Sequence, residues 1–233
     1  VLITGTNRGL GLALATLYAR RGWKVIATAR EPQQAADLQG VALKYPNVTI
    51  EQLDVAKNEE IAALAQKYQG QPIDVLINNA GLLGERDKQS FSQTLDYATF
   101  EDMLRVNSYA PLLVSQAFLR NVLLGDQKKI VAITSALASI TDAARFGGLP
   151  FYRMSKAALN MGMRTLQAEV RSRGVRVGIL SPGAVETRML RQRGFNGESM
   201  APAASAAAVI KNIDALGDAE ARFIQYNGDI LPW

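Results

Sequence analysis

Short apolar runs alternate with longer amphipathic stretches along most of the chain. The runs are rich in Val, Ile and Leu and show little alternation, which is typical of strands buried on both faces of a parallel sheet. They cover residues 1–4, 24–29, 48–53, 75–78, 130–134 and 175–180, and a last strand is expected near 222–225. The stretches between them have the apolar spacing of helices and cover residues 10–21, 33–45, 59–68, 100–124 and 151–173.

This alternation of strands and helices predicts one α/β domain over residues 1–233. Strand–helix–strand units are right-handed, so they build a doubly wound parallel sheet of the Rossmann type, the middle layer of a three-layer αβα sandwich. Residues 183–202 are an exception, because this segment is long for a connection and rich in glycine and arginine. We expect it to be a substrate lid or a mobile loop. The alanine-rich stretch 201–208 predicts a plain surface helix.

Neither cysteine nor histidine occurs among the 233 residues, and this absence excludes several kinds of chemistry. Disulfides, thiolate nucleophiles, histidine-based catalytic triads and zinc sites built from Cys or His are ruled out. Acid–base chemistry near neutral pH must therefore use Tyr, Lys, Asp or Glu. We predict no metal site.

The charge and the longest apolar runs bear on partners and location. The net charge is +5, but the basic residues are scattered rather than clustered with aromatic residues, so a nucleic-acid partner is not expected. Each apolar run is far shorter than the roughly 18 residues of a membrane-spanning helix, and the chain opens on a strand rather than on a signal peptide. We expect a soluble, cytoplasmic protein.

A glycine-rich turn follows the first predicted strand. Its sequence is Thr4-Gly5-Thr6-Asn7-Arg8-Gly9-Leu10-Gly11, and an apolar-periodic helix comes directly after it. Glycines allow a tight turn and a close approach of the backbone to a pyrophosphate, while the helix N-terminus offers N–H groups to the anion. The turn therefore predicts a dinucleotide site. Chance spacing of glycines is the competing interpretation, and the position at the first strand–helix turn favours the site.

The end of the second strand indicates which dinucleotide fits. Proteins that bind NAD place Asp or Glu about 20 residues beyond the glycines, where it bonds the ribose 2′-hydroxyl. This chain has Ala29-Arg30 there, and Arg8 lies within the glycine turn. Two guanidinium groups suit a 2′-phosphate, so we expect NADP(H) in preference to NAD(H). The alternative is that Arg30 is only a solvated charge at the end of a strand.

Tyr152 and Lys156 stand one helical turn apart near the start of a long predicted helix. A free tyrosine has a pKa of about 10, and a neighbouring ammonium lowers it by roughly 1–3. The pair is thus a credible acid–base device in a protein without histidine. By itself the spacing is more often a surface pair.

Polar residues also follow two of the predicted strands. Ser135 comes directly after residues 130–134, and Asn78-Asn79-Ala80-Gly81 ends the strand 75–78. Turn-forming or capping roles are usual for Ser and Asn in such places. The carboxyl ends of parallel strands meet at one edge of the sheet, where open α/β sheets bind ligands. Because Ser135 and the segment 78–81 both lie at that edge, a functional site is favoured.

Taken together, these motifs resemble the short-chain dehydrogenase/reductase family along essentially the whole chain. The motifs are Thr4-Gly5-x-x-x-Gly9-x-Gly11, Asp54-Val55, Asn78-Asn79-Ala80-Gly81, Asn107, Ser135, Tyr152-x-x-x-Lys156 and Pro182-Gly183. Within the family the stretch 152–160 and the tail 228–233 resemble the sniffer and C-factor-like branch of carbonyl reductases.

The resemblance implies a role for each motif residue. Tyr152 would be the proton donor, Lys156 would bind the nicotinamide ribose, Ser135 would hold the substrate oxygen, and Asn107 would position a water in the proton relay. Asp54 and Val55 would flank the adenine, and Asn78 and Gly81 would shape the adenosine side. The implied cofactor contacts are Gly5, Asn7, Arg8, Gly9, Leu10, Gly11, Arg30, Asp54, Val55, Asn79, Ala80, Gly81, Tyr152, Lys156, Pro182, Gly183, Val185 and Thr187.

The predicted activity is reversible hydride transfer between NADP(H) and a small carbonyl or alcohol substrate. Apolar side chains near the expected site suggest an aldehyde, ketone or quinone; they are Leu82, Leu83, Ala136, Leu137, Phe146, Leu149, Met189, Leu190, Phe195 and Met200. Arg188, Arg191 and Arg193 either attract an anionic substrate or form a solvated loop face.

The sequence also allows a second function and suggests an oligomeric state. The second candidate is an NADPH-binding sensor or signalling protein of the C-factor type with little turnover. An epimerase or dehydratase is disfavoured because the chain lacks length for a separate substrate domain. By analogy with the family we expect a homodimer or homotetramer; Leu159, Met163 and Leu166 are either dimer contacts or core residues.

Overall fold

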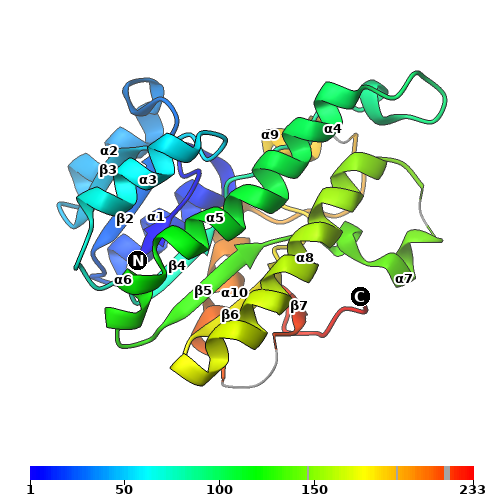
Figure 1. The fold of residues 1–233 in the computed structure, drawn as a ribbon. Coiled ribbons are helices and arrows are strands. Elements are labelled where there is room, and N and C mark those ends of the chain that lie inside the picture. The colour runs from blue at the N-terminus through cyan, green and yellow to red at the C-terminus, as the bar shows by residue number, and fades with distance from the viewer. Residues whose placement is uncertain (146, 193, 218–220) are drawn as a thin grey trace.

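Parallel strands form the centre of the molecule (Figure 1), seen in a computed structural model that describes residues 1–145, 147–192, 194–217 and 221–233. Within these residues one seven-stranded sheet has the order β3-β2-β1-β4-β5-β6-β7, and all neighbouring strands are parallel. The strands are β1 Leu2–Ile3, β2 Val25–Ala29, β3 Val48–Gln52, β4 Val75–Asn78, β5 Lys129–Ile133, β6 Arg176–Ser181 and β7 Phe223–Gln225. The predicted strands are confirmed to within one or two residues at their ends.

The strand order reverses between β1 and β4. The chain winds outward from β1 to β3, then returns to the other side of β1 and winds outward again to β7. Loops after β1 and β4 therefore leave the sheet in opposite directions and open a crevice at the carboxyl ends of these strands. The glycine turn and the Asn78–Gly81 segment lie at this crevice.

Two layers of helices cover the sheet, as the αβα prediction requires. One face packs against α1, α2 and α10, through apolar residues such as Leu14, Leu38 and Val209. The other packs against α3, α5, α6 and α8, through residues such as Ile61 and Leu159. The helices are α1 Gly9–Arg20, α2 Ala36–Lys44, α3 Asn58–Lys67, α4 Tyr97–Leu104, α5 Ala110–Ala117, α6 Leu119–Leu124, α7 Ile140–Ala143, α8 Pro150–Val170, α9 Arg188–Gln192 and α10 Pro202–Asp214.

The single helix expected over residues 100–124 is wrong. The structure has α4, a π-helical turn over Arg105–Tyr109, then α5, and α6 begins after a break at Phe118. Pro111 has no N–H and so cannot donate to the carbonyl of Asn107 four residues earlier, which disrupts the regular helical ladder there. Asn107 and Ser108 are buried in this turn and face α8.

Two further expectations change with burial. The alanine-rich helix is more than a surface helix, because Ala206, Val209 and Ile210 of α10 are fully buried and α10 packs against α1. Leu159 and Met163, left open between core and dimer contact, are core residues with 1% and 0% exposure. Leu166 packs against the same core.

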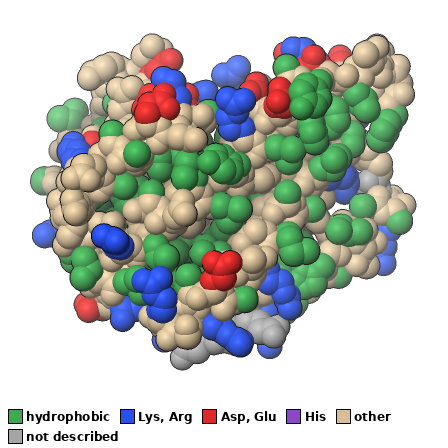
Figure 2. Space-filling view, viewed as in Figure 1, with side chains coloured by type: hydrophobic (Ala, Val, Ile, Leu, Met, Phe, Trp, Pro, Cys, Tyr) green, Lys and Arg blue, Asp and Glu red, His purple; other side chains and the backbone are tan. Residues whose placement is uncertain are grey.

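Among the described residues, no helix combines the length and the apolar character that crossing a membrane requires. Space-filling Figure 2 shows basic, acidic and hydrophobic side chains mixed over the visible face, with green side chains more frequent around α4 and α8. Exposed apolar residues of this region include Tyr97, Tyr109 and Met161.

Candidate active site

The glycine turn after β1 has a backbone that only glycine suits. Gly5 and Gly9 have φ of +71° and +58°, in the left-handed region that disfavours other residues. A Cβ on Gly5 would lie 2.9 Å from the Cα of Ala80, and one on Gly11 would overlap the carbonyl oxygen of Gly5. The turn is therefore compact, and α1 starts directly beneath it.

Side chains from β1 and β4 fasten this turn to the neighbouring loop. The hydroxyl oxygen of Thr4 accepts hydrogen bonds from the main-chain N–H groups of Asn79 and Ala80, at 3.0 Å each. The Asn79 amide donates to the carbonyls of Thr4 and Gly5 at 2.9 Å. Asn79, predicted as a cofactor contact, thus braces the backbone on which a cofactor would rest.

The segment after β6 reaches the same turn. A Cβ on Gly9 would lie 3.1 Å from the Thr187 methyl carbon, so Thr187 lies directly against the glycine turn. Gly183 has φ +78°, and Pro182 is held because its carbonyl accepts from the Ser205 hydroxyl at 2.8 Å. Of the predicted contacts after β6, Thr187 touches the glycine turn, Val185 is buried, and Pro182 and Gly183 are partly buried.

Two arginines and an aspartate belong to the loops that follow β1, β2 and β3. The N–H of Leu53 donates to the carbonyl of Ala29 at 2.9 Å, which brings the ends of β2 and β3 together. Arg30 and Asp54 follow these two residues, and the Asp54 carboxylate is turned onto its own loop, where it accepts from the N–H of Ala56 at 3.0 Å. Arg8 and Arg30 are exposed, and Val55 is buried.

The Lys156 ammonium is buried at the inner end of the crevice. Only 4% of this residue is exposed, and its Nζ donates to the carbonyl of Ile133, at the end of β5, at 2.9 Å. A Cβ on Gly81 would lie 3.5 Å from this Nζ and 3.2 Å from Oδ1 of Asn107. Burial lowers the pKa of Lys156 to about 8 because it disfavours the charged form.

Asn107 connects the loop after β4 to α8. Its Oδ1 accepts from the N–H of Leu82 at 2.9 Å, and its Nδ2 donates to the Leu82 carbonyl at 2.8 Å and to the Ser155 hydroxyl at 3.0 Å. The π-helical turn directs this side chain inward. The sequence predicted Asn107 but not its partner Ser155, because nothing in the spacing marked it.

Tyr152 and Ser135 complete the set of residues predicted as catalytic. Tyr152 is 7% exposed and packs in an apolar cluster with Leu83, Leu149 and Phe151. Ser135 is half-buried, and its oxygen accepts from the N–H of Leu137 at 3.2 Å, so its own hydroxyl hydrogen can be donated to another group. β5 carries Ser135 at its end, and α8 carries Tyr152 and Lys156 in its first two turns.

Not every predicted residue joins this site. Asn78 is buried, and its amide donates to the Ser115 hydroxyl of α5 at 3.0 Å, so its side chain braces α5. Leu82, Leu83, Leu137, Leu149 and Met189 do gather in the cluster around Tyr152, together with Phe100, Met103 and Phe151, which the sequence did not single out. Arg188 and Arg191 are exposed. The predictions for Phe146 and Arg193 fall outside the described residues.

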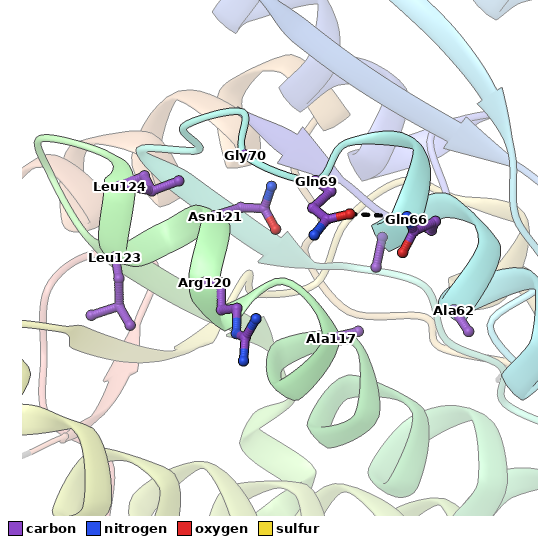
Figure 3. Close-up of a pocket in the computed structure, with 10 residues that line it drawn as sticks. Ala62, Gln66, Gln69, Gly70, Ala117, Arg120, Asn121, Leu123 and Leu124 are labelled. Carbon is purple, nitrogen blue, oxygen red and sulfur yellow. Dashed lines mark hydrogen bonds between the residues drawn. The ribbon is translucent and has the colours of Figure 1, made fainter.

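A hollow of about 670 Å³ lies elsewhere, between the end of α3 and helices α5 and α6 (Figure 3). Of its ten lining residues only Arg120 is charged, and Gln66 donates to Gln69 at 2.9 Å on its wall. Gly70 precedes β4 and Leu124 precedes β5, so this hollow is at the amino edge of the sheet, opposite the crevice. It carries no acid–base pair.

Comparisons with known proteins agree with this geometry. Residues 1–196 match the family model described as short chain dehydrogenase. The chain belongs to the short-chain dehydrogenase family. C-signal of Myxococcus xanthus is 34% identical to this dehydrogenase over 163 residues, which are 70% of this chain and 93% of the relative.

Two solved structures are similar to this dehydrogenase over its whole length. The NADPH-bound carbonyl reductase from chicken fatty liver is 31% identical with a TM-score of 0.88, covering 100% of this chain and 98% of that one. Carbonyl reductase Sniffer of D. melanogaster is 26% identical with a TM-score of 0.87 and the same coverage of both chains. The resemblance to the sniffer and C-factor-like branch is confirmed.

Burial of Lys156 makes a prediction about stability and pH. The unfolded lysine keeps its ordinary pKa of 10.5, while the folded value is about 8. Between these two pH values the unfolded chain therefore binds more protons than the folded protein. The free energy of unfolding of the wild-type protein should rise with pH across that window. We expect Lys156→Met to unfold with a higher free energy than the wild-type protein below pH 8, by on the order of 3 kcal/mol.

Urea unfolding of the ligand-free proteins from pH 7 to pH 10.5 measures this difference, which should shrink as the pH rises. Lys211→Met, at an exposed position of α10, serves as the control and should show no such trend. A difference between wild type and Lys156→Met that stays constant with pH would contradict the buried charge.

Proposed function

We propose that this dehydrogenase is an NADPH-dependent carbonyl reductase that acts on small apolar aldehydes, ketones or quinones, and on the corresponding alcohols in reverse. The observation that carries the proposal is the buried Tyr152–Lys156 turn of α8 at the crevice between β1 and β4, with Lys156 Nζ held to the Ile133 carbonyl. A surface pair would be solvated, whereas Tyr152 and Lys156 are only 7% and 4% exposed.

The crevice fits a dinucleotide phosphate. The glycine turn presents main chain without side chains at Gly9 and Gly11, where a Cβ would press on Thr187 or on the Gly5 carbonyl. Helix α1 begins at Gly9, so its N-terminal N–H groups lie at this turn. Exposed Arg8 and Arg30 suit a 2′-phosphate. Of the two acids near Arg30, Glu31 is exposed, and the Asp54 carboxylate accepts from the N–H of Ala56 on its own loop. The NADP in our proposal also agrees with the NADPH named in the chicken carbonyl reductase structure.

When bound, NADPH supplies the hydride, and the chain's own residues place and protonate the substrate. Ser135 would donate its hydroxyl hydrogen to the substrate carbonyl oxygen, since that hydroxyl already accepts from Leu137. Tyr152 would give its phenolic proton to the developing alkoxide. Lys156, with two N–H groups beyond the one bound to Ile133, would bind the ribose and favour the phenolate by its charge.

The apolar cluster around Tyr152 supports the substrate class. Leu82, Leu83, Leu137 and Met189 border the tyrosine, so a substrate there would meet aliphatic surface with few polar groups. A sensor with little turnover is not favoured, because a sensor does not require Ser135, Tyr152 and Lys156 to be assembled at one edge of the sheet.

The homodimer or homotetramer stays a prediction. It is supported by exposed apolar side chains on α8 and the π-helical turn: Met161 is 69% exposed, and Tyr109 is 50% exposed.

Substitution Tyr152→Phe tests the proton donor. We expect NADPH oxidation with a panel of aldehydes and diketones to fall below a few per cent of the wild-type rate, because the substitution removes the phenolic hydroxyl that donates the proton and keeps the ring. Binding of NADPH, followed by its fluorescence, should be unchanged. Retention of a larger rate would remove Tyr152 from the mechanism.

Arg30→Ala tests cofactor choice. Loss of one charge-assisted contact to a phosphate is worth roughly 1.5–3 kcal/mol, so kcat/KM for NADPH should fall about ten- to a hundredfold while that for NADH changes little. Steady-state kinetics with both cofactors measure this ratio, and Arg171→Ala, an exposed arginine after α8, is the control. An equal loss with both cofactors would show that Arg30 does not read the 2′-phosphate.

Residues 183–202 are proposed as a substrate lid. The N–H of Met200 donates to the Ala184 carbonyl at 2.9 Å, and the N–H of Glu186 donates to the Met200 carbonyl at 2.9 Å. These bonds form a narrow neck, and the described residues beyond it, including α9, make a flap whose base at Thr187 touches the glycine turn. A ligand on that turn would contact the base of the flap.

Limited trypsin digestion checks the lid. Exposed Arg188 and Arg191 lie on the flap, and we expect NADPH to slow cleavage after them severalfold because bound cofactor holds the flap closed. ATP at the same concentration controls for ionic effects. Equal cleavage rates with and without NADPH would count against a lid.

A further inference from the structure

Gln89 is a fully buried polar residue next to the proposed acid. It ends the short 3₁₀ turn Asp87–Gln89 in the loop after β4, and 0% of its surface is exposed. Its Nε2 donates to the carbonyl of Leu83 at 2.8 Å and weakly to that of Glu85 at 3.4 Å. Its Oε1 accepts from the main-chain N–H of Tyr152 at 3.2 Å. A buried amide with partners at both ends links two separate segments.

The first turn of α8 depends on this outside partner. Leu149 precedes the helix with φ +56°, a left-handed conformation that is strained for leucine, and Pro150 has no N–H. The first bond of the helical ladder runs from the N–H of Arg153 to the carbonyl of Leu149 at 3.0 Å. The N–H of Tyr152 comes one residue too early for a partner within the helix. Gln89 supplies that partner.

The other end of the Tyr152 peptide unit is held as well. The Tyr152 carbonyl accepts from the Ser155 hydroxyl at 2.9 Å, and that hydroxyl accepts from Asn107 Nδ2 at 3.0 Å. Asn107 in turn bonds both main-chain groups of Leu82. Three polar side chains thus connect the main chain of Tyr152 to neighbouring residues of one loop. Gln89 links its N–H to Leu83, and Ser155 with Asn107 links its carbonyl to Leu82.

That loop is itself firmly packed. Gly84 has φ +69° and sits so close to α4 that a Cβ there would lie 3.0 Å from the Thr99 methyl carbon and would overlap the end of Met103. Leu83 is 4% exposed in the cluster around Tyr152. Gln89 therefore ties the tyrosine to the part of this loop, Leu83 and Gly84, that packs against the Tyr152 cluster and α4.

We propose that Gln89 is a positioning residue that fixes the first turn of α8, and with it the phenol of Tyr152, against the loop that lines the substrate side. This role rests on the proposed reductase function. Without the Gln89 bond, the start of α8 follows two glycines and a strained leucine, and helix ends fray when their N–H groups lack partners. The phenol would then spend less time at the reacting oxygen, while the contacts that the glycine turn makes to the cofactor would be unaffected.

Gln89→Met separates positioning from a merely structural role, because Met keeps the length of the side chain and removes the hydrogen bonds at both ends of the amide. We expect kcat to fall about tenfold, with KM for NADPH and the NADPH dissociation constant within twofold of wild type. Backbone amide exchange measured by NMR should speed up about tenfold at Tyr152 and remain unchanged at Leu159, in the middle of α8. Gln93→Met, an exposed glutamine of the same loop, should match wild type in every measurement.

The outcomes distinguish this proposal from the reductase function. If wild type reduces carbonyls but Gln89→Met keeps its kcat and its Tyr152 amide protection, the Gln89 role is wrong and the function stands. A parallel loss of kcat and of NADPH affinity would make Gln89 a general structural residue and also overturn the role. If wild type turns over no carbonyl, the function fails, and the amide exchange still tests the clamp on its own.

Should Gln89→Met fail to fold, the wild-type protein decides the matter. A Tyr152 amide that exchanges as slowly as that of Arg153, the first residue bonded within the helix, supports the clamp. Exchange at the rate of a solvated amide would overturn it.

Discussion

A lysine charge held out of water is the constraint on which this molecule depends. Lys156 is buried and bonded to the Ile133 carbonyl at 2.9 Å, and its desolvation lowers its pKa to about 8. Burying a charged group costs folding free energy, and hydrogen bonds such as the one to Ile133 offset only part of that cost. In a chain without histidine, the buried lysine stands one helical turn from Tyr152, and the proposed acid–base chemistry uses its charge.

Backbone geometry prepares the other half of the crevice. The strand order reverses between β1 and β4, so the loops after these two strands leave the sheet in opposite directions. Four hydrogen bonds of the Thr4 and Asn79 side chains connect the starts of the two loops. The pyrophosphate platform is therefore braced before any ligand arrives, so little ordering entropy remains to be lost on binding. Glycine is required at Gly5 and Gly11 because Ala80 and the Gly5 carbonyl leave no room for a Cβ.

Hydrogen bonds from two buried side chains, Asn107 and Gln89, set the position of the first turns of α8. Asn107 reaches α8 because a π-helical turn redirects its side chain, and Gln89 reaches it from a loop that packs against α4. Each of these two amides is buried, so each needs hydrogen-bond partners. Those partners are present only when the loop after β4 and the start of α8 lie as they do here. A rigid Tyr152 is the consequence.

Local patterns in the sequence predict most of the elements and the chemistry. Buried strands have continuous apolar runs, the turn after β1 has its glycines, and Tyr152 and Lys156 share a helix face because four residues make about one turn. Each of these signals is local. The break of residues 100–124 into four pieces, the inward direction of Asn78 to Ser115, and the contacts of Gln89 and Ser155 with Tyr152 were decided only in the tertiary structure. These hydrogen bonds join residues 3 to 63 positions apart. The sequence pattern does not predict them, because packing in three dimensions rather than spacing along the chain decides which polar groups meet.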